Sequence, residues 1–284
     1  GRVFSTGSDV TRWKAGDMVG VGCMVDSCRT CPSCEDGLEQ YCEAGMTGTY
    51  GGVEKQTGLP TQGGYSNAIV VHDRYVLRIP DGMDPAGAAP LLCAGITTFS
   101  PLRHWKVGPG SRVGVVGIGG LGHMAVKLAA AMGAHVVVLT TSPSKIDDAK
   151  RLGAHDVVMS SDPAAMKAIR NSLDLIIDTV GTSHDLEPEF ALLRRDGALC
   201  LLGGSPEPHH YPGAFSFIMR RKKLAGSLIG GIPETQEMLD FCAAHHILAD
   251  IEVVAASAIN EAYERMLKAD VKYRFVIDLS TLEG

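Results

Sequence analysis

The stretch VGVVGIGGLG, residues 113–122, decides the fold. Its first four residues are a β-rich apolar run, and glycines then follow at G-x-G-x-x-G spacing before a segment with helical periodicity. A strand, a glycine turn and a helix in that order meet the structural condition attached to this dinucleotide-binding fingerprint. Gly117 permits a tight turn, Gly119 lets the backbone approach a pyrophosphate, and Gly122 lets the helix pack against the strand. The alternative is a glycine-rich turn without a ligand. We predict a dinucleotide site that includes Gly117, Gly119, Gly120, Leu121 and Gly122.

Short apolar runs alternate with helical patterns on both sides of this turn, which favours an α/β fold with a doubly wound parallel sheet. Glycines at 133, 153 and 197 stand where helices commonly stop. The predicted helices are Leu121–Met132, Ser144–Leu152 and Asp185–Arg194. The predicted strands are Arg112–Gly117, Ala134–Thr141, Asp156–Ser160, Leu173–Val180, Ala198–Gly203 and Leu224–Gly230.

The residues before this region are rich in Gly, Pro and Cys and indicate a small irregular β domain, to which the tail of the chain could return. We therefore predict two domains, residues 1–99 with 232–284, and residues 100–231. In the first of these the predicted strands are Met18–Gly22, Tyr65–Val71, Tyr75–Ile79, Ile251–Ala255 and Arg274–Leu279, and the predicted helices are Glu234–Ala244 and Asn260–Lys268.

The end of the second strand predicts which dinucleotide binds. NAD sites usually place Asp or Glu about 20 residues beyond the first glycine, where it accepts bonds from the ribose 2′-hydroxyl. Here the sequence is LTTSPSK, residues 139–145, with hydroxyls and a lysine that suit a 2′-phosphate. We predict NADP(H), with Thr141, Ser142 and Lys145 at the phosphate. The alternative is that Ser142 or Ser144 caps the next helix and Lys145 is solvated.

Four cysteines, Cys28, Cys31, Cys34 and Cys42, crowd into fifteen residues. Two C-x-x-C spacings and a fourth thiol nearby suit one tetrahedral zinc with no open position, a structural site. A redox pair or disulfides are the alternatives. Cys23 lies outside the spacing and is expected to be a small buried residue.

Composition excludes several classes of function. The net charge of −6, with no Lys/Arg run that interleaves with aromatic residues, argues against a nucleic-acid partner. The N-terminus has no signal-peptide pattern, and no apolar run approaches the length of a membrane span. We expect a cytoplasmic protein that acts on a small molecule.

The chain resembles the zinc-containing medium-chain alcohol dehydrogenases, in particular the NADP-dependent, cinnamyl-alcohol dehydrogenase-like branch. The resemblance implies an incomplete GroES-like β domain with a structural zinc lobe, a Rossmann domain that binds NADP(H), and a homodimer joined along the Rossmann sheet near Ser227–Gly231. It also implies hydride transfer between NADP(H) and a primary alcohol or aldehyde with the help of a catalytic zinc. The phrases that carry the resemblance are GDMVGVG at 16–22, TQGGYS at 61–66, CAGIT at 93–97, GIGGLGH at 117–123, LGG at 202–204, SLIG at 227–230 and YRFVID at 273–278.

Individual roles follow from the same resemblance. Cys93 would be a catalytic zinc ligand, Thr97 would approach the nicotinamide and Arg274 would reach the pyrophosphate. The alternatives are that Cys93 is a buried core cysteine, that Thr97 is only a hydroxyl at the start of a helix, and that Arg274 is a surface cation. His123 is expected to pack or cap, and His72 to be a surface histidine on a strand. Two segments would border the nicotinamide ring. They are Leu202–Gly204, which contains Gly203, and Ser227–Ile229, which begins at Ser227 and ends at Ile229.

The resemblance places the other catalytic-zinc ligands and the relay hydroxyl in Cys-His-Ser/Thr and Gly-His-Glu segments that would precede Gly1. One cysteine cannot hold a catalytic zinc. We therefore expect the chain to be a fragment of an alcohol dehydrogenase. The alternatives are an inactive NADP-binding product and a zinc-free quinone or enone reductase on the same fold.

Overall fold

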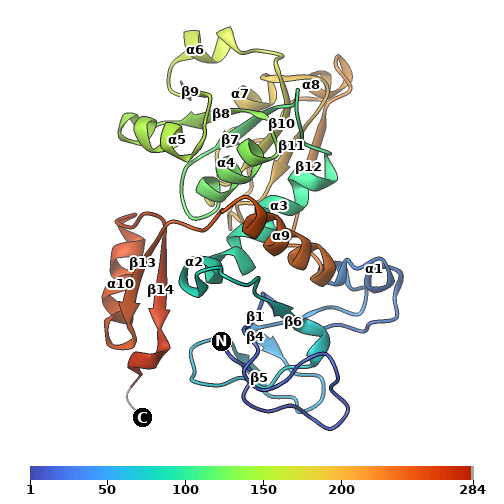
Figure 1. Cartoon of the computed structure of the whole chain (residues 1–284). Coiled ribbons are helices and arrows are strands. Elements are labelled where there is room, and N and C mark those ends of the chain that lie inside the picture. Colours follow the sequence, from blue (N-terminus) through green and yellow to red (C-terminus); the bar gives the residue numbers. More distant parts are fainter. Residues whose placement is uncertain (283–284) are drawn as a thin grey trace. The chain divides into compact units, whose positions relative to one another are not determined.

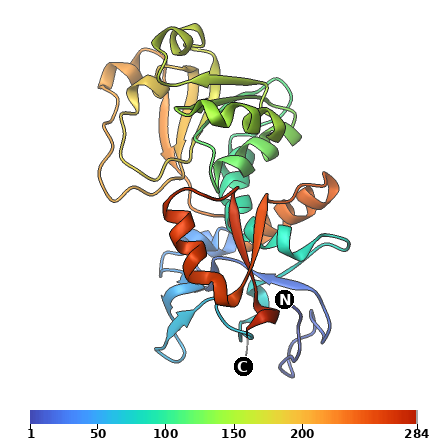
Figure 2. The same ribbon diagram turned by 90° about the vertical axis from the view of Figure 1, so that its left-hand side faces the viewer.

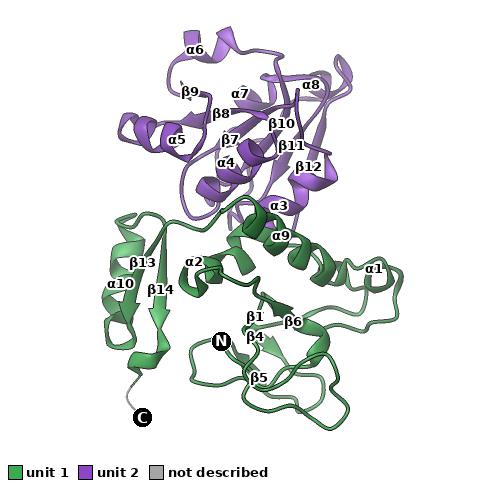
Figure 3. Ribbon diagram, in the orientation of Figure 1, with its two compact units in different colours: residues 1–96, 229–284 green, residues 97–228 purple. Residues whose placement is uncertain are grey.

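The computed structural model describes residues 1–282 and divides into two compact units. Unit 1 contains residues 1–96 and 229–284, and unit 2 contains residues 97–228 (Figure 3). These divisions lie beside the predicted domain boundaries after residues 99 and 231. Within residues 1–282 no helix is long and apolar enough to cross a membrane.

A six-stranded sheet forms the centre of unit 2, with the order β12-β11-β10-β7-β8-β9 and every neighbouring pair parallel (Figure 1). The order reverses between β7 and β10, which is the doubly wound arrangement that was predicted. The strands are β7 (Arg112–Val116), β8 (His135–Thr140), β9 (Asp156–Met159), β10 (Leu173–Asp178), β11 (Leu193–Leu201) and β12 (Lys223–Gly226).

Both faces of this sheet are buried, as parallel sheets require. Side chains alternate along a strand, so Val113 and Val115 face one way and Val116 the other, and all three are buried. Val116 joins a core cluster with Met166 and Phe190 from two helices. The helices of unit 2 are most of α3 (Ala94–His104), then α4 (Gly122–Ala131), α5 (Ile146–Leu152), α6 (Pro163–Ala168), α7 (Glu187–Phe190), α8 (Ala214–Ile218) and the 3-10 turn η4 (Pro143–Lys145).

Unit 1 is built from pairs of short strands and a few helices. The antiparallel pairs are β1 (Val19–Val21) with β6 (Val76–Arg78), β2 (Met24–Asp26) with β3 (Thr47–Gly48), and β4 (Tyr50–Val53) with β5 (Pro60–Gln62). The tail adds the parallel pair β13 (Ile251–Ala255) and β14 (Arg274–Asp278), with α10 (Ile259–Leu267) beside β13 (Figure 2). The remaining elements are α1 (Pro32–Glu35), α2 (Pro85–Ala88), α9 (Ile232–Ala244) and the 3-10 turns η1 (Glu39–Tyr41), η2 (Asp73–Tyr75), η3 (Ala89–Leu92), η5 (Ala256–Ala258) and η6 (Leu279–Thr281).

Three expectations about local structure were wrong. The run 65–71 forms no strand, and Val70 is 92% exposed there, because its apolar pattern has no partner strand in the described residues. The helix predicted over 185–194 is only α7, and the next strand already begins at Leu193. Gly197 does not end a helix but lies inside β11, where a Cβ would come within 3.1 Å of the Leu173 carbonyl. The close approach of two backbones, rather than a helix end, requires that glycine.

Candidate zinc and coenzyme sites

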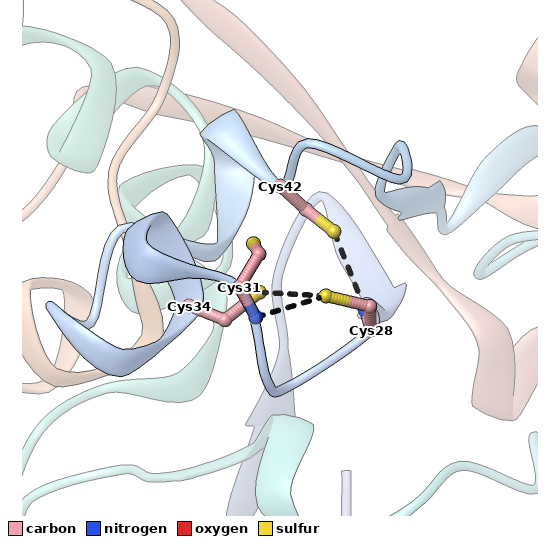
Figure 4. Close-up of side chains that lie close together, drawn as sticks. All are labelled: Cys28, Cys31, Cys34 and Cys42. Atoms are coloured by element: carbon pink, nitrogen blue, oxygen red, sulfur yellow. Dashed lines mark hydrogen bonds between the residues drawn. The ribbon is translucent and has the colours of Figure 1, made fainter.

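The four clustered cysteines come together on one loop of unit 1, where they are drawn in Figure 4. Cys28 and Cys31 follow β2, Cys34 lies in α1, and Cys42 follows η1. All four sulfur atoms lie within 4.8 Å of one another, and those of Cys28 and Cys34 are 3.9 Å apart. Zn–S bonds of about 2.3 Å at tetrahedral angles separate two sulfurs by about 3.8 Å. The donor set and its spacing therefore fit zinc.

Backbone N–H groups support negative charge on these sulfurs. The Cys31 N–H donates to Cys28 Sγ at 3.3 Å, the Cys28 N–H donates to Cys42 Sγ at 3.3 Å, and the Glu43 N–H donates to Cys31 Sγ at 3.4 Å. Hydrogen bonds from the Thr30 and Cys31 backbone lower the pKa of Cys28 to about 6. The thiolate, which is the form that binds metal, is thus favoured at neutral pH.

A buried hydroxyl chain reaches the fourth sulfur, which the sequence did not reveal. The Ser27 hydroxyl lies 3.2 Å from Cys34 Sγ and 2.7 Å from the Tyr75 hydroxyl, and both hydroxyl-bearing residues are almost fully buried. Burial raises the pKa of Cys34 to about 11, and the Ser27 hydrogen bond opposes that rise. Ser27 and Tyr75 are therefore positioned to hold Cys34 as a ligand.

The glycine turn of unit 2 has the geometry that the fingerprint predicts. Gly117 has φ +81, and a Cβ on Gly122 would lie 2.1 Å from the Gly117 carbonyl oxygen, so neither position admits another residue without strain. A Cβ on Gly119 would meet nothing within 4 Å. The protein's own packing therefore does not require glycine at position 119. The missing side chain leaves the backbone at the start of α4 accessible. His123 is fully buried with Nδ1 3.0 Å from the Gly119 carbonyl, which confirms a packing role.

Lys145 returns to this turn from the end of β8. Its Nζ donates to the Ile118 carbonyl at 2.9 Å, which brings the ammonium beside the glycine motif. Thr141 is exposed, and the Ser142 hydroxyl lies 2.9 Å from that of Ser144. Neither η4 nor α5 has a side-chain cap, so the alternative that Ser142 or Ser144 caps the helix is not what the structure shows.

The remaining predicted coenzyme residues are divided between the units. Gly203 follows β11, and a Cβ there would lie 2.1 Å from the Val180 carbonyl oxygen. The Ser227 N–H donates to the Leu201 carbonyl at 3.2 Å, and Thr97 is buried in α3. Gly120 and Leu121 complete the turn in unit 2, while Ile229 and Arg274 belong to unit 1.

Cys93 ends η3 and is exposed, which is not the position of a buried core cysteine. It is hydrogen-bonded to Cys23, whose Sγ also contacts the Leu92 carbonyl at 3.6 Å. That bond and the charge of Arg274 lower the pKa of Cys93 to about 6, while the same bond raises the pKa of Cys23. Cys23 is thus a partner of Cys93 rather than a plain core residue. His72 is exposed, as expected, but caps η2 instead of lying on a strand.

Comparison with known proteins agrees with these features. Residues 1–81 match the alcohol dehydrogenase GroES-like domain, and residues 120–244 match the zinc-binding dehydrogenase family. The chain is 59% identical to aldehyde reductase YahK of Escherichia coli over 99% of its own length and 81% of that protein. It is 56% identical to NADP-dependent alcohol dehydrogenase C 1 of Mycolicibacterium smegmatis, over 100% of its length and 81% of that protein.

A solved structure gives the same result. A cinnamyl alcohol dehydrogenase from Sorghum bicolor matches with a TM-score of 0.95 and 47% identity, over 98% of this chain and 79% of that one. With the parallel sheet, the glycine turn and the cysteine cluster, these matches show that the chain belongs to the zinc-containing medium-chain alcohol dehydrogenase family, whose members are alcohol and aldehyde oxidoreductases.

Proposed function

We propose that this protein transfers hydride between NADP(H) and a primary alcohol or aldehyde. The observation that carries the proposal is the phosphate-binding character of the turn after β8. Thr141 and Ser142 offer hydroxyls, Lys145 offers an ammonium beside the glycine turn, and residues 139–145 contain no acid. A 2′-phosphate is stabilised by such donors and would be repelled by the carboxylate typical of NAD sites.

The turn between β7 and α4 binds the pyrophosphate in this proposal. Gly117 and Gly122 hold the backbone in place, and Gly119 leaves room for the ligand. The N–H groups and positive dipole end of α4 stabilise the anion without a charged side chain. By resemblance, Thr97, Gly203, Ser227, Ile229 and Arg274 are further proposed coenzyme contacts.

Cys93 is the proposed ligand of a catalytic zinc. Its lowered pKa keeps it a thiolate at neutral pH, and Cys23 and Arg274 stabilise that charge. A zinc held by Cys93 and the ligands of the preceding segments would supply a Lewis acid for the substrate oxygen, and NADP(H) would supply the hydride chemistry. The Cys28, Cys31, Cys34 and Cys42 site has no open position and is proposed to stabilise the fold only.

The experiment is NADPH oxidation by the protein with a panel of aromatic and aliphatic aldehydes, with bound zinc measured on the same sample. In a protein that also carries the Cys-His-Ser/Thr and Gly-His-Glu segments, which supply the other zinc ligands, we expect activity that Cys93→Ser abolishes. The matched control is Cys242→Ser, which changes a buried thiol on α9 that lies 3.6 Å from Met238 Sδ, and we expect it to keep bound zinc and activity. Reduction of quinones without bound zinc, or equal activity in Cys93→Ser, would replace this proposal with a zinc-free reductase.

We also propose a homodimer in a reducing compartment such as the cytoplasm. The eight cysteines form no disulfide within residues 1–282, which suits such a compartment. β12 is the last strand of the parallel sheet, and its outer edge can pair with a second copy. Light scattering of the purified protein tests this, with a mass of two chains expected.

A further inference from the structure

Three ionisable side chains of unit 2 meet in a buried group, the Asp178–His184–Glu189 cluster. Asp178 ends β10 and is 1% exposed, and Glu189 lies in α7 and is 7% exposed. His184 Nε2 lies 3.1 Å from Asp178 Oδ2 and 3.4 Å from Glu189 Oε2. Within residues 1–282 these two carboxylate oxygens and His184 Nε2 are buried and have no hydrogen-bond partner, so the three groups meet as ion pairs. His184 is therefore the group that compensates both acids.

The other ring nitrogen fixes the charge of His184. Nδ1 lies 3.0 Å from the Thr182 carbonyl oxygen, which only accepts, so Nδ1 carries a hydrogen. A neutral ring would then point a lone pair from Nε2 at two acids. An ion pair with an ionised acid requires a second ring hydrogen, and the two acids favour this imidazolium form of His184. Burial opposes its charge, but the Thr182 bond and the two acids outweigh burial and raise the pKa of His184.

Neighbouring charged groups complete the surroundings of the cluster. The His209 ring lies against that of His184 with centroids 4.9 Å apart, and the charge of His209 also acts on Asp178. Cys200 of β11 faces Asp178, and Asp185 acts on Glu189. The cluster thus lies among three acids, Asp178, Glu189 and Asp185, and two histidines, His184 and His209.

Asp178 connects this cluster to the coenzyme turn. Its Oδ1 accepts the Val180 N–H at 2.9 Å, and its backbone carbonyl accepts the Leu202 N–H at 2.9 Å. Val180 in turn packs against Gly117, where a Cβ would come within 3.4 Å of its side chain, and against Gly203. Residues 178–180, which we call the Asp178 segment, therefore lie between the glycine turn and the turn after β11.

We propose that His184 is a positioning residue for coenzyme binding, because its pairing with Asp178 and Glu189 fixes the Asp178 segment against the glycine turn. The inference rests on the proposed binding of NADP(H) to that turn. It adds that coenzyme affinity depends on the charge of a group that does not contact the coenzyme.

The direction of the pH dependence follows from the acids. Burial and the charge of Asp178 raise the pKa of Glu189 to about 7, and burial raises the pKa of Asp178. A carboxyl whose pKa is raised by folding stabilises the fold below its unfolded pKa, and this contribution is lost as the pH rises through the folded pKa. The raised pKa of His184 has the same sign. The cluster therefore holds the Asp178 segment most firmly below about pH 7, and affinity decreases above it.

The experiment is fluorescence titration of the protein with NADPH at about pH 6 and about pH 8.5, on either side of the Glu189 transition. The variant is Glu189→Gln, which keeps the shape and removes the titrating charge. The matched control is Glu187→Gln on the same helix, whose carboxylate accepts from Ser216 rather than His184. Because NADPH titrates equally in every sample, only differences between variants report on the cluster.

We expect the dissociation constant to increase about five- to tenfold more between these pH values in the wild type and Glu187→Gln than in Glu189→Gln. His184→Ala should weaken binding at both pH values by leaving two acids together, and His184→Ala/Glu189→Gln should recover part of the loss. Equal pH dependence in the wild type, Glu187→Gln and Glu189→Gln would overturn the inference while leaving NADPH binding intact.

A second measurement separates this inference from the proposed function and needs no variant. Hydrogen exchange of the Val180 amide, which donates to Asp178, should become faster relative to the Val115 amide as the pH rises through about 7. Exchange rates that keep a constant ratio would overturn the inference even if the protein bound no NADPH. Absence of NADPH binding at every pH would instead overturn the proposed function.

Discussion

Single residues decide what the coenzyme turn can do, and two glycines do so for different reasons. Gly122 is constrained by the protein itself, because a Cβ would lie 2.1 Å from the Gly117 carbonyl oxygen. Gly119 is not, because a Cβ there would meet nothing within 4 Å. The sequence motif treats the two alike, whereas the structure separates a folding requirement from a binding requirement.

Alanine substitutions should separate these requirements. Gly122→Ala should decrease the free energy of unfolding of the protein by about 1–3 kcal/mol, because backbone must shift to admit the methyl group. Gly119→Ala should leave the free energy of unfolding nearly unchanged and weaken NADPH binding about tenfold or more, because the methyl group occupies the space of the pyrophosphate. Denaturant unfolding and NADPH titration check both. A stable Gly122→Ala, or a Gly119→Ala that binds normally, would contradict the assignment.

Lys145 should affect only the phosphorylated coenzyme. Lys145→Ala removes one charge-assisted contact to the 2′-phosphate, so NADPH affinity should decrease about tenfold and NADH affinity should change little. Parallel titrations with the two coenzymes measure this. Equal losses for both coenzymes would show that Lys145 acts through its bond to the Ile118 carbonyl and not through the phosphate.

At the scale of elements, the sequence predicted well where local chemistry decides and less well where packing does. The strands of unit 2 could be predicted from their β-branched residues, and the cysteine cluster from its spacing, because each of these signals is local. The run 65–71 was misread because alternation cannot show that a partner strand is lacking. The Asp178–His184–Glu189 cluster had no sequence signal, because α7 and the loop before it bring the three side chains together only in the fold.

The zinc loop should depend on pH through its thiols. Cys28 has a lowered pKa of about 6, and a group of this kind contributes at high pH and loses that contribution as the pH falls through its folded pKa. We therefore expect one tightly bound zinc at neutral pH and its release below about pH 6. Zinc measured after dialysis across this range tests the expectation, and retention of zinc well below that pH would contradict it.

The hydroxyl chain should slow zinc release. Ser27→Ala removes the bond to Cys34, whereas Tyr75→Phe leaves that bond and removes the hydroxyl that orients Ser27 and that also contacts Arg29. Loss of such outer contacts typically costs 10–100-fold in metal affinity. We expect faster transfer of zinc to a chromogenic chelator in Ser27→Ala and a smaller effect in Tyr75→Phe. Wild-type release rates in both variants would show that the hydroxyl chain has no role in metal binding.

For the molecule as a whole, the family follows from the sequence, the fold and the comparisons together, while coenzyme preference rests on a few side chains. The parallel sheet of unit 2 and the short strand pairs of unit 1 are common to enzymes that differ in coenzyme. The residues that distinguish one coenzyme from the other are the seven at 139–145, which include the end of β8 and the turn after it. Coenzyme choice is therefore the claim on which the proposed function depends most.

The measurement that tests this claim most directly is titration of the wild-type protein with NADPH and NADH under the same conditions. We predict that NADPH binds at least about tenfold more tightly, because the 2′-phosphate gains contacts that a 2′-hydroxyl lacks. Equal affinities, or tighter binding of NADH, would contradict the assignment of Thr141, Ser142 and Lys145 as a phosphate site.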